Sequence, residues 1–298
     1  MRARVRYEKL PTEQRNPKSR DLDKLSTTQL LRLMNREDLS VVHVISRNLP
    51  AIARAVNAIA ASLRRGGQLF FVGAGTSGRL GVIEAAECPP TFHTQPSMVQ
   101  ALIAGGNKAV FRSQEGSEDD LLAGRKTVQA CVRKGDVVVG IAASGVTPFV
   151  QAALAAAKQR GAKTILVTCS TQSTIPAAIR IVIPVGPEVL TGSTRLKAGT
   201  ATKLVLNMLT LGSMVRLGKT YGNLMVDVRP ASRKLKARAV RMLQLLTHTS
   251  TGEASGLMRQ AHGRVKAAVV MHQKRLSYRQ AMQRISKVGG SLRRALTR

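Results

Sequence analysis

Short apolar runs alternate with longer helical stretches through the middle of the chain. The runs are rich in Val, Ile and Leu, as buried strands are, and they lie at 69–72, 99–103, 137–142, 163–167 and 181–185. The stretches between them are rich in alanine, most clearly at 148–160. Strands that alternate with helices predict right-handed crossovers and a parallel sheet covered on both faces. The expected fold class is therefore α/β, a parallel sheet flanked by helices.

Helical patterns flank this central region on both sides. Ser26 is well placed as an N-cap, and a second helical pattern covers about 51–63. A long helix is expected at about 197–217, and the chain beyond it has the pattern of three or four short helices. We predict three parts, a helical lead-in at 1–55, a central α/β domain at 56–228 and a helical C-terminal region at 229–298.

The composition agrees with a large buried core. Hydrophobic residues make up 44% of the 298 residues, aromatic residues only 3%, and Trp is absent. This mixture is typical of helices packed on a parallel sheet. No run of about 18 apolar residues is present, and the charged first residues are followed by no apolar segment. We therefore expect a cytoplasmic protein without a membrane span or signal peptide.

The chain is strongly basic. Its 47 Lys and Arg residues against 16 acids give a formal net charge of +31. The excess is concentrated after residue 228, where 17 basic residues face the single acid Glu253. Such a charge favours the binding of nucleic acids and other polyanions, and it also speeds the capture of small anionic ligands. A solvated basic surface is the simpler interpretation, and nucleic-acid binding stays open as a non-specific property.

Two loops rich in glycine and hydroxyl groups follow two of the predicted strands. The first covers 73–79 (GAGTSGR) and the second 142–148 (AASGVTP), each before a predicted helix. Helix N-termini direct amide N–H groups at anions, and Ser and Thr hydroxyls add donors. Loops of this kind at neighbouring strand ends form the crevice where parallel sheets bind ligands. The predicted ligands of a phosphate group are Gly75, Thr76, Ser77, Ser144, Gly145 and Thr147.

Other phosphate-binding motifs fit these loops poorly. No acidic residue closes the next strand as a dinucleotide-binding motif requires, and no Gly-Lys-Ser/Thr triplet forms a P-loop. A third segment at 190–200 places hydroxyls and cations at the start of the long helix. It suits an anionic ligand and equally suits an N-capped helix with exposed cations. The candidate ligands in this segment are Ser193, Thr194, Arg195 and Lys197.

Taken together, these segments resemble the sugar isomerase (SIS) domain, a phosphosugar-binding module, and most closely the N-acetylmuramic acid 6-phosphate etherase family. The resemblance also includes the segments 12–17 (TEQRNP), 87–92 (ECPPTF), 115–120 (EGSEDD) and 221–227 (YGNLMVD). It covers most of residues 12–228 in the family's order. The chain departs from the family pattern at Val146, where Arg is usual. The C-terminal region resembles the family more loosely and is more basic.

The resemblance implies a lyase that needs no metal or cofactor and uses Glu87 and Glu118 as catalytic groups. Such an enzyme cleaves the D-lactyl ether of N-acetylmuramic acid 6-phosphate to N-acetylglucosamine 6-phosphate and D-lactate. A base removes the C2 proton, an acid protonates the leaving oxygen at C3, and water then adds to the unsaturated aldehyde. We assign Glu87 as the acid and Glu118 as the base. Residues 87–90 are expected to form a rigid turn that holds Glu87 near the crevice.

Two other functions stay open at this level. SIS domains also occur in regulators that bind a sugar phosphate without converting it, although both glutamates argue for catalysis. A nucleic-acid-binding protein is the second alternative, but no helix-turn-helix, zinc or aromatic stacking motif supports it. The family resemblance further implies that the chain forms a homodimer. It also implies that the chain binds a phosphorylated amino sugar.

Overall fold

The computed structural model describes residues 7–228, 230 and 232–297. The chain divides into two compact units. The first contains the chain up to Ala85 and Ser97–Thr210, and the second contains Ala86–Pro96 and the chain from Leu211 onward.

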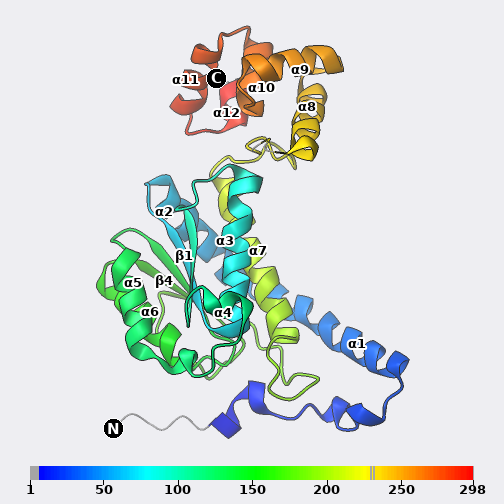
Figure 1. Ribbon diagram of the computed structural model, residues 1–298, viewed down its shortest axis with the longest axis vertical. Coiled ribbons are helices and arrows are strands. Elements are labelled where there is room, and N and C mark those ends of the chain that lie inside the picture. Colours follow the sequence, from blue (N-terminus) through cyan, green and yellow to red (C-terminus); the bar gives the residue numbers. More distant parts are fainter. Residues whose placement is uncertain (1–6, 229, 231, 298) are drawn as a thin grey trace. The chain divides into compact units, whose positions relative to one another are not determined.

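The first unit is built on a five-stranded parallel sheet, which confirms the predicted fold class (Figure 1). Its strands stand in the order β2-β1-β3-β4-β5, and all neighbouring pairs are parallel. The strand bounds are Leu69–Gly73 for β1, Val99–Ile103 for β2, Val137–Ile141 for β3, Lys163–Thr168 for β4 and Ile179–Val182 for β5. Strands β1 and β3 are buried along their whole length, as expected for a sheet covered on both faces.

The last strand lies earlier in the chain than the predicted 181–185. Strand β5 ends at Val182, and the amide of Ile183 still donates to the Thr168 carbonyl at 2.8 Å. Pro184 follows and has no N–H group, so the ladder cannot continue through it. The apolar pattern located the strand, and the proline explains its end.

Helices cover both faces of the sheet. On one face α5 (Leu121–Cys131) and α6 (Pro148–Gln159) pack over Phe70, Val138 and Leu166. On the other face α3 (Gly75–Phe92) lies so close to Phe71 that a Cβ at Gly81 would come within 2.8 Å of it. Two further helices are α2 (Leu49–Arg64), which packs against β5, and the short α4 (Lys108–Phe111).

The long helix α7 (Lys197–Arg216) is joined to α3 by a buried carboxylate. Lys203 Nζ lies 2.6 Å from Glu84 Oε1, and the Thr210 hydroxyl donates to Glu84 Oε2 at 2.6 Å. Because Glu84 is buried and both its oxygens are engaged, it fixes the two helices to each other.

Residues 87–90 form part of a helix, and the predicted rigid turn is wrong. Helix α3 continues through Pro89 and Pro90 to Phe92, and the amide of His93 donates to the Pro89 carbonyl. Proline fixes φ at a value that a helix accepts, but each of the two prolines removes one backbone donor, and its ring crowds the carbonyl four residues earlier. Helix α3 thus includes both prolines and ends at Phe92.

The N-terminal lead-in is a series of short 3₁₀ turns followed by one long helix. The turns are Tyr7–Lys9 (η1), Pro11–Glu13 (η2), Pro17–Ser19 (η3) and Leu22–Lys24 (η4). Helix α1 (Thr27–Ser46) begins at the predicted N-cap Ser26, whose hydroxyl and Gln29 form a reciprocal capping box. The first six residues of the lead-in predicted at 1–55 lie outside the described residues.

In its described part, the second unit contains five helices after residue 230, more than the three or four predicted. They are α8 (Arg233–Thr247), α9 (Thr251–Gln260), α10 (Val265–Lys274), α11 (Tyr278–Lys287) and α12 (Leu292–Thr297). Ser250 and Ser277 each begin a helix with a capping box. The buried Lys266 donates to Asp227 Oδ2 and to the carbonyls of Gly218 and Gly290, which ties three loops together. Across the described residues, no helix has the length and apolar character that crossing a membrane requires.

Candidate active site

The sheet topology brings the two predicted phosphate loops together. Strands β1 and β3 are neighbours in register, with Gly73 opposite Ile141 at their carboxyl ends. The chain leaves β1 toward β2 on one side and later adds β3 on the other, so the strand order reverses between β1 and β3. Parallel sheets bind ligands at such a point.

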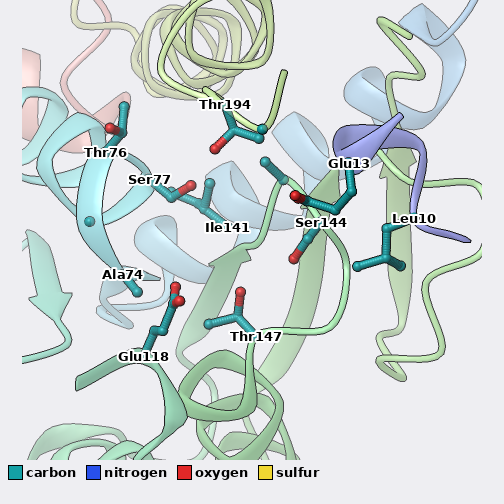
Figure 2. Close-up of a pocket in the computed structure, with 13 residues that line it drawn as sticks. Leu10, Glu13, Ala74, Thr76, Ser77, Glu118, Ile141, Ser144, Thr147 and Thr194 are labelled. Atoms are coloured by element: carbon teal, nitrogen blue, oxygen red, sulfur yellow. The ribbon is translucent and has the colours of Figure 1, made fainter. Parts of the chain in front are cut away.

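A cavity of about 290 Å³ lies at this place. Hydroxyl and small side chains dominate its wall, and two carboxylates complete it (Figure 2). The lining residues are Leu10, Glu13, Ala74, Gly75, Thr76, Ser77, Glu118, Ile141, Ala143, Ser144, Thr147, Gly192 and Thr194. The structure thus brings together predicted site residues from all three loop segments and one of the two predicted catalytic glutamates.

The first loop can take its shape because two positions have no side chain. A Cβ at Gly73 would lie 2.7 Å from the amide nitrogen of Gly78, and one at Gly78 would lie 2.5 Å from Ile103 Cγ1. Helix α3 therefore begins directly at the strand end, with Thr76 and Ser77 in its first turn at the cavity wall. This places hydroxyls and unpaired amides of a helix N-terminus beside the same space.

The second loop is held by a buried serine. Ser173 Oγ donates to the Gly145 carbonyl at 2.7 Å, and Gly145 has a φ of +76°. A Cβ at Gly145 would lie 2.4 Å from Ser173 Cβ, so only glycine fits. Ser144 and Thr147 line the cavity on either side, while Gly145 shapes the loop from outside the lining. Thr147 is also the N-cap residue of α6, although its side chain makes no capping bond to the described residues.

The third segment contributes less to the cavity than the sequence suggests. Gly192 and Thr194 line it, whereas Ser193 and the exposed Arg195 do not. The first amides of α7 are occupied within the protein, because the backbone N–H groups of Lys197 and Ala198 donate to the Glu188 carboxylate at 2.9 Å each.

Lys197 is bound within the protein. Its Nζ lies 2.6 Å from Glu37 Oε2, and both side chains are buried. Glu37 also accepts hydrogen bonds from Lys18 and Asn16 at 2.8 Å each. Lys197 therefore supports the segment that carries Thr194 through a contact to α1, outside the cavity lining.

Glu118 faces the cavity from the 3₁₀ turn η5 (Ser117–Asp119) (Figure 2). The helix after this turn begins at Asp120, whose carboxylate caps the Ala123 amide, so Glu118 is not needed as a cap. Partial burial raises the pKa of Glu118, and the negative charges of Asp119 and Glu115 raise it further. A raised pKa makes a carboxylate a stronger base once it is ionised. Glu118 also borders a smaller adjoining cavity of about 110 Å³.

Glu87 is exposed and lies in the part of α3 that belongs to the second unit. It is not among the lining residues, all of which belong to the first unit. The role predicted for Glu87 therefore stays a prediction.

Sequence reasoning missed the contribution of the N-terminal segment. Leu10 and Glu13 line the cavity, although the sequence connects residues 12–17 only with a family resemblance. The only local signal for this role is that Glu13 lies between Thr12 and the polar residues 14–16. Among the described residues, no three His, Cys, Asp or Glu side chains gather as a metal site requires.

The chain matches two family models. The glucokinase regulatory protein N-terminal SIS domain model matches residues 51–158, and the SIS domain model matches residues 115–212. Both matches include the loop after β3. They agree with the five-stranded parallel sheet and its flanking helices.

Similarity to curated proteins extends over nearly the full chain. An N-acetylmuramic acid 6-phosphate etherase of Geobacillus thermodenitrificans is 51% identical over 292 residues, which cover 97% of this chain and 99% of the relative. The N-acetylmuramic acid 6-phosphate etherase of Gloeobacter violaceus is 55% identical over 266 residues, which cover 88% of this chain and 87% of the relative.

A solved structure supports the fold. A phosphoheptose isomerase from Francisella tularensis superposes with a TM-score of 0.51 at 16% sequence identity, covering 64% of this chain and 100% of the isomerase. At this identity the likeness concerns the fold of the sheet and its helices.

Proposed function

Because this chain belongs to the N-acetylmuramic acid 6-phosphate etherase family, we propose that it cleaves the D-lactyl ether of N-acetylmuramic acid 6-phosphate. The products are N-acetylglucosamine 6-phosphate and D-lactate, formed by elimination and then hydration. The observation that carries the proposal is the cavity at the β1–β3 switch point, where hydroxyl-rich loops and Glu118 share one space.

The phosphate group binds at the loops after β1 and β3. Five hydroxyls line the cavity, those of Thr76, Ser77, Ser144, Thr147 and Thr194. The first turns of α3 and α6 begin at the same wall and add amide donors with the favourable end of the helix dipole. A dianion is bound here by hydrogen-bond donors, since no Lys or Arg is among the lining residues of the described chain.

Glu118 acts as the base. In the open-chain sugar the C1 aldehyde acidifies the C2 proton, and an ionised Glu118 removes it to give an enolate. The electron pair then forms the C2–C3 double bond and expels the lactyl oxygen from C3. Glu87 donates the proton that this oxygen takes up, and water adds to the double bond at C3. General acid and base groups each contribute roughly 10²–10⁴-fold to such steps.

The proposal includes the partners and setting implied by the family. The enzyme works as a homodimer in the cytoplasm on a phosphorylated amino sugar and needs no metal or cofactor. Residues 56–228 carry the catalytic domain, with the lead-in at 1–55 and the basic helical region at 229–298 attached to it. Ser193 and Arg195 lie outside the cavity lining, and the proposal is that they reach the bound substrate from the loop before α7, which Lys197 supports.

The test is release of D-lactate by the purified protein from N-acetylmuramic acid 6-phosphate and from the unphosphorylated sugar. We expect turnover of the phosphorylated sugar alone, since the loops provide donors for phosphate. Equal turnover of both sugars would contradict the phosphate site. Binding of the phosphorylated sugar without lactate release would show a sensor instead of an enzyme.

A further inference from the structure

Two carboxylates line the cavity, and the reaction above uses only Glu118. The other is Glu13, which reaches the cavity from η2 in the N-terminal segment. Figure 2 shows its carboxylate directed into the cavity from the side opposite Glu118. The steps proposed above give this carboxylate no role.

The backbone around Glu13 is anchored on both sides. Leu10 and Thr12 are buried before and beside it, and the Glu13 amide donates to the Leu10 carbonyl at 3.0 Å. After it, the buried Asn16 donates to Glu37 Oε2 at 2.8 Å and to the Pro187 carbonyl at 3.3 Å. The position of Glu13 is thus fixed by buried contacts, although its side chain is exposed to the cavity.

The carboxylate itself is oriented by two neighbours. Thr12 Oγ1 donates to Glu13 Oε1 at 3.1 Å. Gly192 has a φ of +76°, and a Cβ there would lie 3.3 Å from Glu13 Oε2. The glycine therefore leaves room for Oε2 beside the loop that carries Thr194.

The chemistry of the cavity decides what Glu13 can bind. A carboxylate has only acceptors and repels a phosphate dianion, so the five hydroxyls and helix amides must take the phosphate. The neutral part of an amino sugar offers the complementary groups, hydroxyl O–H and amide N–H donors. We propose that Glu13 is a substrate-contacting residue, which accepts hydrogen bonds from the sugar and orients it with C2 toward Glu118. This inference rests on the proposed function for the identity of the sugar.

The test compares binding of two probes to the full chain, N-acetylglucosamine 6-phosphate and inorganic phosphate. Glu13→Ala should weaken binding of the sugar phosphate by about 10- to 100-fold, the value of a hydrogen bond to a charged group. Binding of inorganic phosphate should stay the same or tighten, because a repelling charge is lost. Glu13→Gln keeps one acceptor and should lose less, and kcat/KM for lactate release should follow the sugar-phosphate affinity.

Glu8→Gln is the matched control, since Glu8 is an exposed glutamate of the same segment outside the cavity lining. It should bind both probes like the wild type. Equal sugar-phosphate affinity in wild type and Glu13→Ala would overturn the inference, and so would equal losses for both probes, which would indicate a structural role. A wild type that binds the sugar phosphate but releases no lactate contradicts the proposed function and leaves this comparison valid. A wild type that binds neither probe contradicts both.

Discussion

Lys197 Nζ lies 2.6 Å from Glu37 Oε2 in the interior of the first unit, and the two residues are 160 positions apart in the chain. Burial alone would raise the pKa of Glu37, but hydrogen bonds from Lys18, Lys197 and Asn16 outweigh it and lower the pKa to about 2. The pair thus joins α1, the N-terminal segment and the start of α7 beside the cavity.

Glu37→Ala should destabilise the protein strongly. Removing one partner of a buried ion pair leaves an uncompensated charge, here the ammonium of Lys197, at a cost of about 3–5 kcal/mol. Denaturant unfolding followed by circular dichroism measures the loss. Asp21→Ala is the control, since it removes an exposed pair with Lys24 at 2.8 Å that is worth at most about 1 kcal/mol. Similar losses in both variants would show that the buried pair adds no stability.

The pH profile of the reaction should report the environment of Glu118. Burial and the charges of Asp119 and Glu115 raise the pKa of Glu118 above its ordinary value of 4.5. Because the base acts in its ionised form, kcat/KM should rise with pH through this raised pKa. Glu115→Gln removes one like charge and should shift this limb to lower pH. The measurement is lactate release at low substrate concentration across the acidic range.

Asp120→Asn serves as the control for this shift. Asn keeps the N-cap contact that Asp120 makes to the Ala123 amide, and Asp120 is not among the groups that raise the pKa of Glu118. Its acidic limb should therefore coincide with that of the wild type. A limb that moves with Asp120→Asn and not with Glu115→Gln would contradict the assignment of this limb to Glu118.

Salt should separate substrate steering from nucleic-acid binding. If the net charge of +31 only attracts an anionic substrate, kcat/KM should fall as ionic strength rises, because screening shortens the range of the attraction. The value of kcat at saturating substrate should stay nearly constant and is the internal control. Tight, salt-sensitive binding of duplex DNA at physiological ionic strength would instead favour a nucleic-acid function for the basic region.

The pattern of the sequence predicted the sheet and its loops well, because local signals fix them. Buried strands such as β1 and β3 have continuous apolar runs, and Gly73 and Gly78 mark a turn so tight that a Cβ at either position would clash with its neighbours. The ends of strands and helices depend on single backbone N–H donors, so the sequence predicts them less accurately. Pro184 ends β5 early, while Pro89 and Pro90 do not end α3.

The site was predicted less completely, because contacts distant in the chain decide it. The residues next to Lys197 in the sequence do not indicate whether its ammonium binds a ligand or pairs with Glu37. Glu13 likewise reaches the cavity only because Asn16 is held by Glu37 and Pro187. Such placements follow from tertiary packing, which a single sequence does not display.

The two proposed catalytic glutamates should differ in one measurable step. Elimination passes through a C2 enolate, so the base can exchange the C2 proton with solvent even when the leaving group cannot depart. Glu118→Gln should therefore abolish both lactate release and C2 exchange, measured by mass spectrometry of substrate recovered from deuterated water. Glu87→Gln should block lactate release and retain C2 exchange, since the base remains intact.

Glutamine keeps the shape and much of the hydrogen bonding of glutamate while it removes the titratable proton, so both variants should fold. Glu8→Gln, the exposed control, should release lactate at the wild-type rate. Loss of exchange in Glu87→Gln together with its retention in Glu118→Gln would reverse the two roles. Because Glu118 lines the cavity and Glu87 does not, full activity in Glu87→Gln alone would mean that another group or water protonates the lactyl oxygen. Full activity in both variants would exclude both residues from catalysis.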